Sequence, residues 1–192
     1  MEPRASWTGV WRFVAGLIAC LVLGWFAFVR DTRVPLLGLV DLGFHELGHL
    51  VTYVFPDVVT ASMGSISQVV VPVGIALYFV LVRVDLMAGG VCLAWAATSA
   101  QDASVYIADA PYQRLQLIGG EHDWAFVLGP QHLNMLHRAA LIAGTVKGLG
   151  VLLLVAGVVA CLVGLLRGVR ATRRTRDAEP MLEPVSPRAM WR

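Results

Sequence analysis

Two histidines one helical turn apart, with a glutamate beside the first, are the residues of this 192-residue chain best suited to chemistry. His45, Glu46 and His49 fit the pattern His-Glu-x-x-His. On a helix, residues four apart share a face and lie about 6 Å apart along the axis, so both imidazoles can reach one metal ion. Zn²⁺ suits nitrogen ligands and keeps a position open in catalytic sites. The motif therefore predicts a zinc site in which Glu46, the catalytic residue, takes a proton from a bound water.

The motif lies inside an apolar run, DLGFHELGHLVTY at residues 41–53. An ionisable residue at the centre of a bilayer costs about 2.5–3.5 kcal/mol on the insertion scale, and is a candidate functional residue by default. Asp41 precedes His45 by four residues and shares its helix face. Its carboxylate can accept the free N–H of a metal-bound imidazole. The alternative for Asp41 is a residue at a helix start near the membrane interface.

A third metal ligand must come from another segment, because catalytic zinc sites usually have three protein ligands. Thr98, Asp102, Tyr106 and Asp109 recur at helical spacing on one face of a later apolar segment. Asp102 matches the depth of His49 if both helices span the membrane in the same direction. We therefore predict Asp102 as the third ligand, with Asp109 as an alternative that could instead cap the helix or bind substrate. A polar helix face packed without metal is the competing interpretation.

The loop that follows is unusually polar for so apolar a chain. Gly119 and Gly120 allow a tight turn that would fold this loop back over the site. His122 is then a rival third ligand or a gate residue, and Asp123 is a further candidate for ligation or for supporting the ligands. The alternative is an interfacial loop anchored by Trp124.

Composition predicts an all-α, multi-pass integral membrane protein, since 57% of the residues are hydrophobic and 15% are charged. A spanning helix needs about 20 apolar residues. Five apolar segments approach that length, although the third is short and could be kinked or re-entrant. They lie at roughly residues 13–29, 36–56, 66–82, 86–108 and 139–166. We predict a membrane helix bundle with about five spans.

The chain divides into three parts by charge and hydropathy. Residues 1–33 form an N-terminal span like a signal anchor, and residues 34–166 form the membrane core with the metal site. Residues 167–192 are basic and then broken by proline, which predicts a disordered tail that touches anionic lipid. Because the basic excess lies in this tail, we place it in the cytoplasm.

FHELGHLV at residues 44–51 resembles the motif helix of the site-2 protease-like group of intramembrane zinc metalloproteases. MGSISQVVVP at residues 63–72 is similar to the glycine-containing segment that follows that helix. The resemblance implies a zinc ion in the membrane, Glu46 as general base and an aspartate from a later span as third ligand. No segment reproduces the Asn/Asp-x-x-Pro-x-Pro-x-Leu-Asp-Gly motif that surrounds that aspartate in the group.

Two further segments, YIADA at residues 106–110 and GGEHDW at residues 119–124, are similar to a set of small bacterial membrane proteins that carry HELGH. Together with the motif helix, they extend the resemblance over about residues 36–124. A bacterial cytoplasmic (inner) membrane is therefore the expected location.

The residues and the resemblance predict a zinc metalloprotease that hydrolyses peptide bonds in membrane-embedded or juxtamembrane segments. Expected partners are membrane lipid and a membrane-protein or peptide substrate, and no nucleic acid. We expect Gln68 to hold a substrate segment extended by hydrogen-bonding its backbone. The alternatives are a metal-binding sensor without protease activity, an ion or proton transporter that uses the same acids and histidines, and a purely structural bundle.

Overall fold

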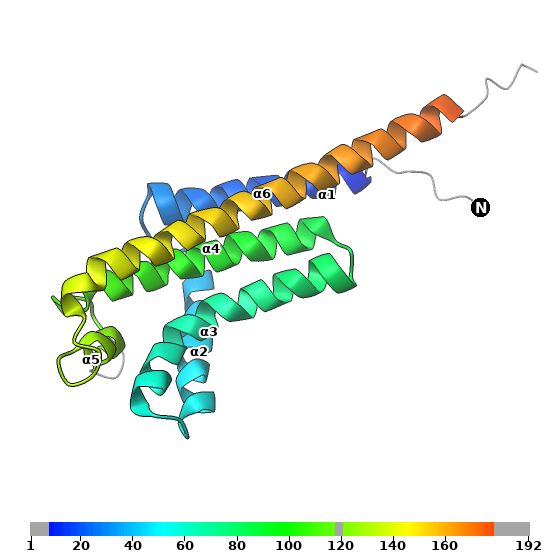
Figure 1. Cartoon of the computed structure of the whole chain (residues 1–192). Coiled ribbons are helices and arrows are strands. Elements are labelled where there is room, and N and C mark those ends of the chain that lie inside the picture. Colours follow the sequence, from blue (N-terminus) through cyan, green and yellow to red (C-terminus); the bar gives the residue numbers. More distant parts are fainter. Residues whose placement is uncertain (1–7, 118–120, 179–192) are drawn as a thin grey trace, which may run out of the picture.

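The computed structural model describes residues 8–117 and 121–178, and within these residues it contains helices and no strands (Figure 1). This confirms the predicted all-α class for the part of the chain described. Two helices continue into a π-helical turn, and a 3-10 turn precedes the last helix. The elements are α1 (Thr8–Gly24), η1 (Trp25–Val29), α2 (Leu37–Thr52), α3 (Asp57–Leu77), η2 (Tyr78–Val82), α4 (Leu86–Asp109), α5 (Asp123–Leu128), η3 (Leu136–Arg138) and α6 (Ala139–Ala178).

Helix α4 is the central helix and packs against α1, α3 and α6. It is rich in alanine, glycine and serine, which let neighbouring backbones approach closely. A Cβ atom on Gly90 would lie 2.6 Å from the carbonyl oxygen of Gly157, and one on Gly157 would lie 2.5 Å from that of Gly90. The backbones of α4 and α6 are therefore in direct contact at this crossing.

Helix α1 runs antiparallel to α6. Near the start of α1, Phe13 packs on Gly164, and after its end Phe28 packs on Gly150. Residue numbers thus rise along one helix while they fall along the other. The start of α1 and the distal part of α6 consequently lie at the same end of the bundle (Figure 1).

Helix α3 runs antiparallel to α4. The side-chain amide of Gln68 donates to the carbonyl oxygen of Ser99, while Val80 packs against Gly89. Helices α4 and α6 are antiparallel as well, since Gly157 lies against Gly90 and Gly150 against Ala97. Helices α1 and α4 therefore run in one direction, and α3 and α6 run in the other.

Three helical stretches are long and apolar enough to cross a membrane, namely Val10–Val29, Asp57–Val82 and Leu136–Arg174. Three of the five predicted segments thus correspond to helices that could cross a membrane, and the prediction of five spans is not confirmed. Helix α2 has 16 residues, or about 24 Å, which is shorter than the roughly 30 Å hydrocarbon core of a bilayer. Helix α4 is long enough, with 24 residues, but its polar residues keep it out of this class.

The predicted boundaries at residues 33 and 166 fall in different kinds of structure. Residue 33 falls in the link between η1 and α2, as expected for the end of a first span. By contrast, α6 runs without a break to Ala178, so residues 167–178 are helical where disorder was predicted. Residues 179–192 lie outside the described part of the chain.

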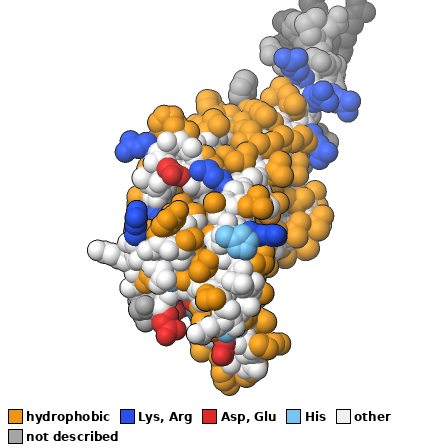
Figure 2. Space-filling model, turned by 60° about the vertical axis from the view of Figure 1, so that its left-hand side comes forward, with side chains coloured by type: hydrophobic (Ala, Val, Ile, Leu, Met, Phe, Trp, Pro, Cys, Tyr) orange, Lys and Arg blue, Asp and Glu red, His pale blue; other side chains and the backbone are white. Residues whose placement is uncertain are grey.

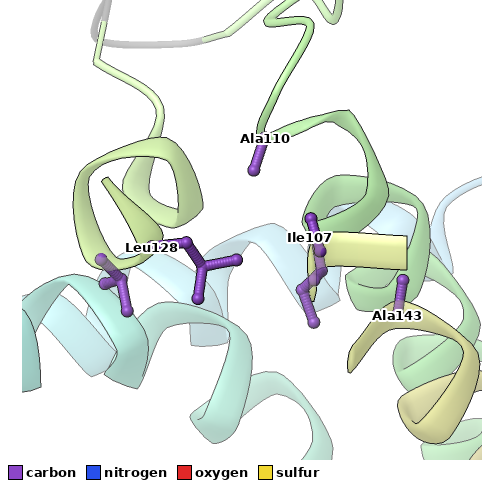
Figure 3. Close-up of a cluster of buried hydrophobic side chains, with 6 residues drawn as sticks. Ile107, Ala110, Leu128 and Ala143 are labelled. Carbon is purple, nitrogen blue, oxygen red and sulfur yellow. The ribbon is translucent and has the colours of Figure 1, made fainter. Parts of the chain in front are cut away.

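An apolar cluster fastens α5 to the end of α4 and the start of α6 (Figure 3). Its buried members are Ile107, Ala110, Val127, Leu128, Ala139 and Ala143. The indole N–H of Trp124 also donates to Ser65 Oγ at 2.9 Å, which ties α5 to α3. These contacts fix the position of Asp123, the first residue of α5.

Candidate metal centre

The two histidines of α2 converge on a glycine of α3. A Cβ atom on Gly64 would lie 2.6 Å from Nε2 of His45 and 2.6 Å from Nε2 of His49. Such an approach is possible because α2 and α3 also touch at Gly48, whose hypothetical Cβ would lie 2.3 Å from the carbonyl oxygen of Met63. The structure thus brings the two imidazoles together as their spacing predicts.

Asp123 supplies the third ligand atom to this pair. Its Oδ2 lies 3.1 Å from Nε2 of His45 and 3.4 Å from Nε2 of His49. Within residues 8–117 and 121–178, this is the one group in which three His, Cys, Asp or Glu ligand atoms lie within 4.8 Å of one another. Asp123 was one of the alternatives to Asp102 for this position.

The donors fit a zinc ion in both type and spacing. Zinc prefers histidine nitrogen and carboxylate oxygen at about 2.0–2.1 Å, and the corners of such a tetrahedron lie about 3.3 Å apart. The two measured N···O separations, 3.1 and 3.4 Å, match that edge. The missing side chain of Gly64 leaves open the place beneath both Nε2 atoms. We conclude that this group could hold a metal ion.

Each imidazole is held through its other nitrogen. His45 Nδ1 lies 3.1 Å from Oε1 of Gln68, whose amide nitrogen is committed to the carbonyl of Ser99. His49 Nδ1 donates to the carbonyl of Thr60 at 2.8 Å. Protons on both Nδ1 atoms leave the Nε2 lone pairs free for a metal. Gln68 therefore orients His45 and is itself tied to α4, while its predicted contact with a substrate backbone stays a prediction.

Asp41 does not perform the role predicted for it beside His45. Its Oδ1 accepts hydrogen bonds from the indole of Trp95 at 2.7 Å and from Ser99 Oγ at 2.8 Å. Burial raises the pKa of Asp41 above its usual value, although these two hydrogen bonds oppose the shift. The side chain joins α2 to α4, and Gln68 makes the contact to His45 in its place.

Asp102 lies apart from the histidine pair. It accepts a hydrogen bond from the guanidinium of Arg33, in the link before α2. Helix α2 is steeply inclined to α4 instead of running beside it (Figure 1). The predicted contact between Asp102 and the metal site required α2 and α4 to run side by side in the same direction. Because α2 is inclined, that contact does not form. Tyr106, one turn after Asp102, is the residue of α4 that reaches the site.

Tyr106 holds the loop-borne carboxylate in place. Its hydroxyl accepts from the backbone N–H of Asp123 at 2.9 Å and lies 3.2 Å from Oδ2 of the same residue. The ring of His122 stacks on Tyr106 with a centroid distance of 4.3 Å. Nδ1 of His122 accepts from the N–H of Ala125 and so caps α5. Burial lowers the pKa of His122, which keeps the ring neutral for this capping role.

His122 and Asp109 are thus supporting residues and lie outside the group of ligand atoms. Asp109 accepts from the backbone N–H groups of Arg114 and Leu115 at 3.0–3.1 Å, and its Oδ2 lies 3.5 Å from His122 Nε2. Asp109 therefore holds the loop after α4 and caps no helix end, while its predicted role in binding substrate stays a prediction. Together these contacts fold the chain after α4 back toward α2.

Glu46 faces open space next to the ligand group. Its side chain is exposed and, with both histidines and Asp123, lines a cavity of about 620 Å³ between α2 and α4. Binding pockets for small ligands commonly have this size. Arg33 and Asp102 lie on the wall of the same cavity. A smaller hollow of about 350 Å³ reaches His49 and Asp123 from the side of Asp57.

The charge state of His45 bears on metal binding. Burial disfavours its protonated form, but the hydrogen bonds to Asp123 and Gln68 outweigh this and raise the pKa of His45 above its ordinary value. A proton thus competes for the same nitrogen that a metal would need. Metal affinity should accordingly fall as the pH drops.

Comparison of the chain with family models, curated proteins and solved structures finds no match in any of the three. The chemistry of the site is therefore inferred from its own residues. The sequence pointed to both histidines and to Glu46, but it gave Gln68 and Tyr106 other roles or none. A lone glutamine in an apolar stretch and a tyrosine on the polar stripe of α4 were the available signals.

Proposed function

We propose that this chain is a zinc-dependent metalloprotease that hydrolyses peptide bonds in membrane-embedded or juxtamembrane segments. The observation that carries the proposal is the convergence of three ligand atoms, from His45, His49 and Asp123, beside an exposed glutamate and a cavity. The resemblance of residues 44–51 to the site-2 protease-like group agrees with this assignment.

The residues around the cavity have complementary roles in such a hydrolysis. A zinc ion in the site would polarise the scissile carbonyl and make water a stronger nucleophile. Glu46 accepts the proton of the attacking water and delivers it to the leaving amine, so that water adds across the broken C–N bond. The hydrogen bonds to Gln68 and to the Thr60 carbonyl keep both imidazoles turned toward the reacting centre.

Metal content tests the ligand set. We expect the purified full-length chain to carry about one zinc per molecule, and His45→Ala to abolish binding because one of three ligands is lost. Asp123→Asn should weaken binding by more than the 10–100-fold typical of residues that only support ligands. Asp102→Asn is the matched control and should keep wild-type affinity, since Asp102 pairs with Arg33. Zinc loss in Asp102→Asn with retention in Asp123→Asn would reverse the assignment.

Glu46→Gln tests catalysis separately from binding. This variant should retain zinc and lose cleavage, so membrane-protein fragments seen with the wild type should be replaced by uncut substrate. A sensor would keep both zinc and its function in Glu46→Gln. A transporter would show loss of ion or proton flux without any change in protein fragments.

A further inference from the structure

Arginine side chains gather at the end of the bundle where α1 begins and α6 runs out. Arg12 pairs with Asp85 at the start of α4, and Arg83 follows η2. The remaining members are Arg167, Arg170, Arg173 and Arg174 on α6. Among the side chains described at this end, the charged residues are thus six arginines and one aspartate, Asp85. Figure 2 shows basic side chains along the projecting part of α6, away from the acidic ones.

A second level of charged residues crosses the other end of the bundle. Asp31, after η1, lies 3.6 Å from Nζ of Lys147 on α6 and accepts a hydrogen bond from Gln101 on α4. Arg33 and Asp102 pair at the same height. Acidic residues predominate from this level outward. Beyond the level the acids include Glu46, Asp57, Asp109, Glu121 and Asp123, against Arg114 and Arg138. At the level itself Arg30, Arg33 and Lys147 accompany Asp31 and Asp102.

Between the two levels, the four long helices contain no charged residue. The uncharged stretches are residues 13–29, 86–100, 148–166 and, on α3, roughly 65–82, and the uncharged run of α3 continues outward past the second level to residue 58. At 1.5 Å per residue, residues 13–29 span about 25 Å and residues 148–166 about 28 Å, close to the roughly 30 Å hydrocarbon core of a bilayer. Helix α4 lies within this layer and is shielded by α1, α3 and α6, which explains how it can be rich in small and polar residues.

The metal-binding residues lie at the outer boundary of this layer. Gln68 and Ser99, which support His45, are within one turn of the second charged level, and Tyr106 and Asp123 are beyond it. Helix α2 crosses the bundle direction at this height (Figure 1) and exposes several large apolar side chains. These are Leu39, Leu47, Leu50 and Val51, and the exposed Val54 and Phe55 follow directly after the helix. Such a helix suits the membrane interface.

We propose that the arginine-rich end faces the cytoplasm and that the metal site opens at the opposite, non-cytoplasmic boundary of the membrane. The positive-inside rule places the arginine-rich end in the cytoplasm, because its arginines closely flank the uncharged stretches. Given the protease function proposed above, the substrates are juxtamembrane peptide segments presented from outside the cytoplasm. Segments at mid-bilayer depth are excluded because the ligands lie at the edge of the uncharged layer.

Cysteine accessibility tests the orientation. The starting variant replaces all three native cysteines, Cys20, Cys92 and Cys161, by alanine. Single cysteines are then introduced as Gln131→Cys, in an exposed loop at the site end, and Arg173→Cys, on the distal part of α6. A membrane-impermeant maleimide applied to spheroplasts should label the first and reach the second only after permeabilisation. The reverse pattern, or labelling of both without permeabilisation, would overturn the orientation.

Depth is tested by a second pair in the same background, labelled after permeabilisation. Val105→Cys lies on α4 beyond the second charged level and lines the larger cavity, whereas Leu152→Cys lies inside the uncharged layer with 65% of its surface exposed. The maleimide should label Val105→Cys at least tenfold faster. Equal rates would place the site within the hydrocarbon core and contradict the proposal.

A fusion of green fluorescent protein to the C-terminus checks orientation without any cysteine substitution, and it should fluoresce. A dark fusion of full length would contradict the cytoplasmic placement. Neither measurement depends on zinc or cleavage. Orientation can therefore fail while the zinc and Glu46→Gln experiments succeed, and the converse result is equally distinguishable.

Discussion

The helix bundle and the candidate metal site are held together by different kinds of contact. Where α4 crosses α6, small residues bring backbone against backbone, with Gly90 and Gly157 at the closest approach. At the metal site, the joining contacts are hydrogen bonds between polar side chains of four helices. The bundle should therefore be sensitive to the size of a side chain, and the site to its chemistry.

The polar contacts of the site form a continuous chain across three helices. His45 on α2 contacts Gln68 on α3, whose amide donates to the backbone of Ser99 on α4. The hydroxyl of Ser99 and the indole of Trp95 both donate to Asp41, which returns the chain to α2. A buried network of this kind fixes orientation when every member is satisfied. The comparison predicts that each region can be disrupted while the other is left intact.

The largest expected effect is on the bundle. Gly157→Val places a branched side chain 2.5 Å from the carbonyl oxygen of Gly90, and a backbone in a packed helix cannot move aside cheaply. Overpacking of this type costs about 1–3 kcal/mol or more. We expect Tm in detergent to fall by several degrees or the chain to fail to fold, as measured by thermal unfolding.

Gly148→Val on the same helix is the control, because a Cβ atom there meets nothing within 4 Å. It carries the same loss of helix flexibility and the same β-branched side chain without the clash. If the two variants unfold at the same temperature, the close α4–α6 crossing is wrong. Molecules of Gly157→Val that remain folded should still bind zinc.

The next effect is confined to the site. Gly64→Ala adds a methyl group 2.6 Å from Nε2 of both His45 and His49, where the metal would need free space. We expect zinc content to fall below about a tenth of the wild-type value, because a tetrahedral site tolerates little displacement of its ligands. Zinc bound per purified chain is the measurement.

Gly74→Ala is the matched control for this substitution. It lies on α3 as well, and a Cβ atom there meets nothing within 4 Å. Both variants gain the same helix propensity, about 1 kcal/mol for glycine to alanine. Normal zinc binding by Gly64→Ala would mean that the two imidazoles do not converge over α3.

At the candidate metal site, the residues close together in the sequence could be predicted, whereas the one that comes from a distant loop could not. His45 and His49 could be predicted as a pair because four residues of helix fix their relative geometry. Asp123 is 74 residues further along than His49, and its place depends on how the loop after α4 folds. The sequence therefore offered several acids for this position and favoured Asp102. What excluded Asp102 was the inclination of α2 relative to α4, which no local pattern records.

The number of spans was uncertain for a related physical reason. Apolar length alone identifies a helix whose apolar side chains are mostly uncovered, such as residues 148–166 of α6. Residues 86–108 were also predicted as a span, and α4 can carry the buried Ser99 and Gln101 because α1, α3 and α6 surround it. Helix α2 lies in the predicted span of residues 36–56, but it has only 16 residues and is not among the three helical stretches long and apolar enough to cross a membrane.

The smallest expected effect comes from removing one support of an imidazole while keeping its volume. Gln68→Met removes the oxygen that holds Nδ1 of His45 and leaves all three ligand atoms in the chain. Loss of such a partner typically weakens metal binding about 10–100-fold. We expect a rise of that size in the zinc Kd, measured by competition with a chelator, and only a small change in Tm.

Gln101→Met tests whether losing any amide in the core would do the same. Gln101 is also buried, but it donates to Asp31 and makes no contact with an imidazole. Its zinc Kd should stay within about twofold of the wild type, because only partners of ligating histidines tune the metal. Equal weakening in both variants would mean that zinc binding follows general stability. A selective loss in Gln68→Met would instead show that His45 must be oriented from α3, so that packing of the bundle alone does not complete the site.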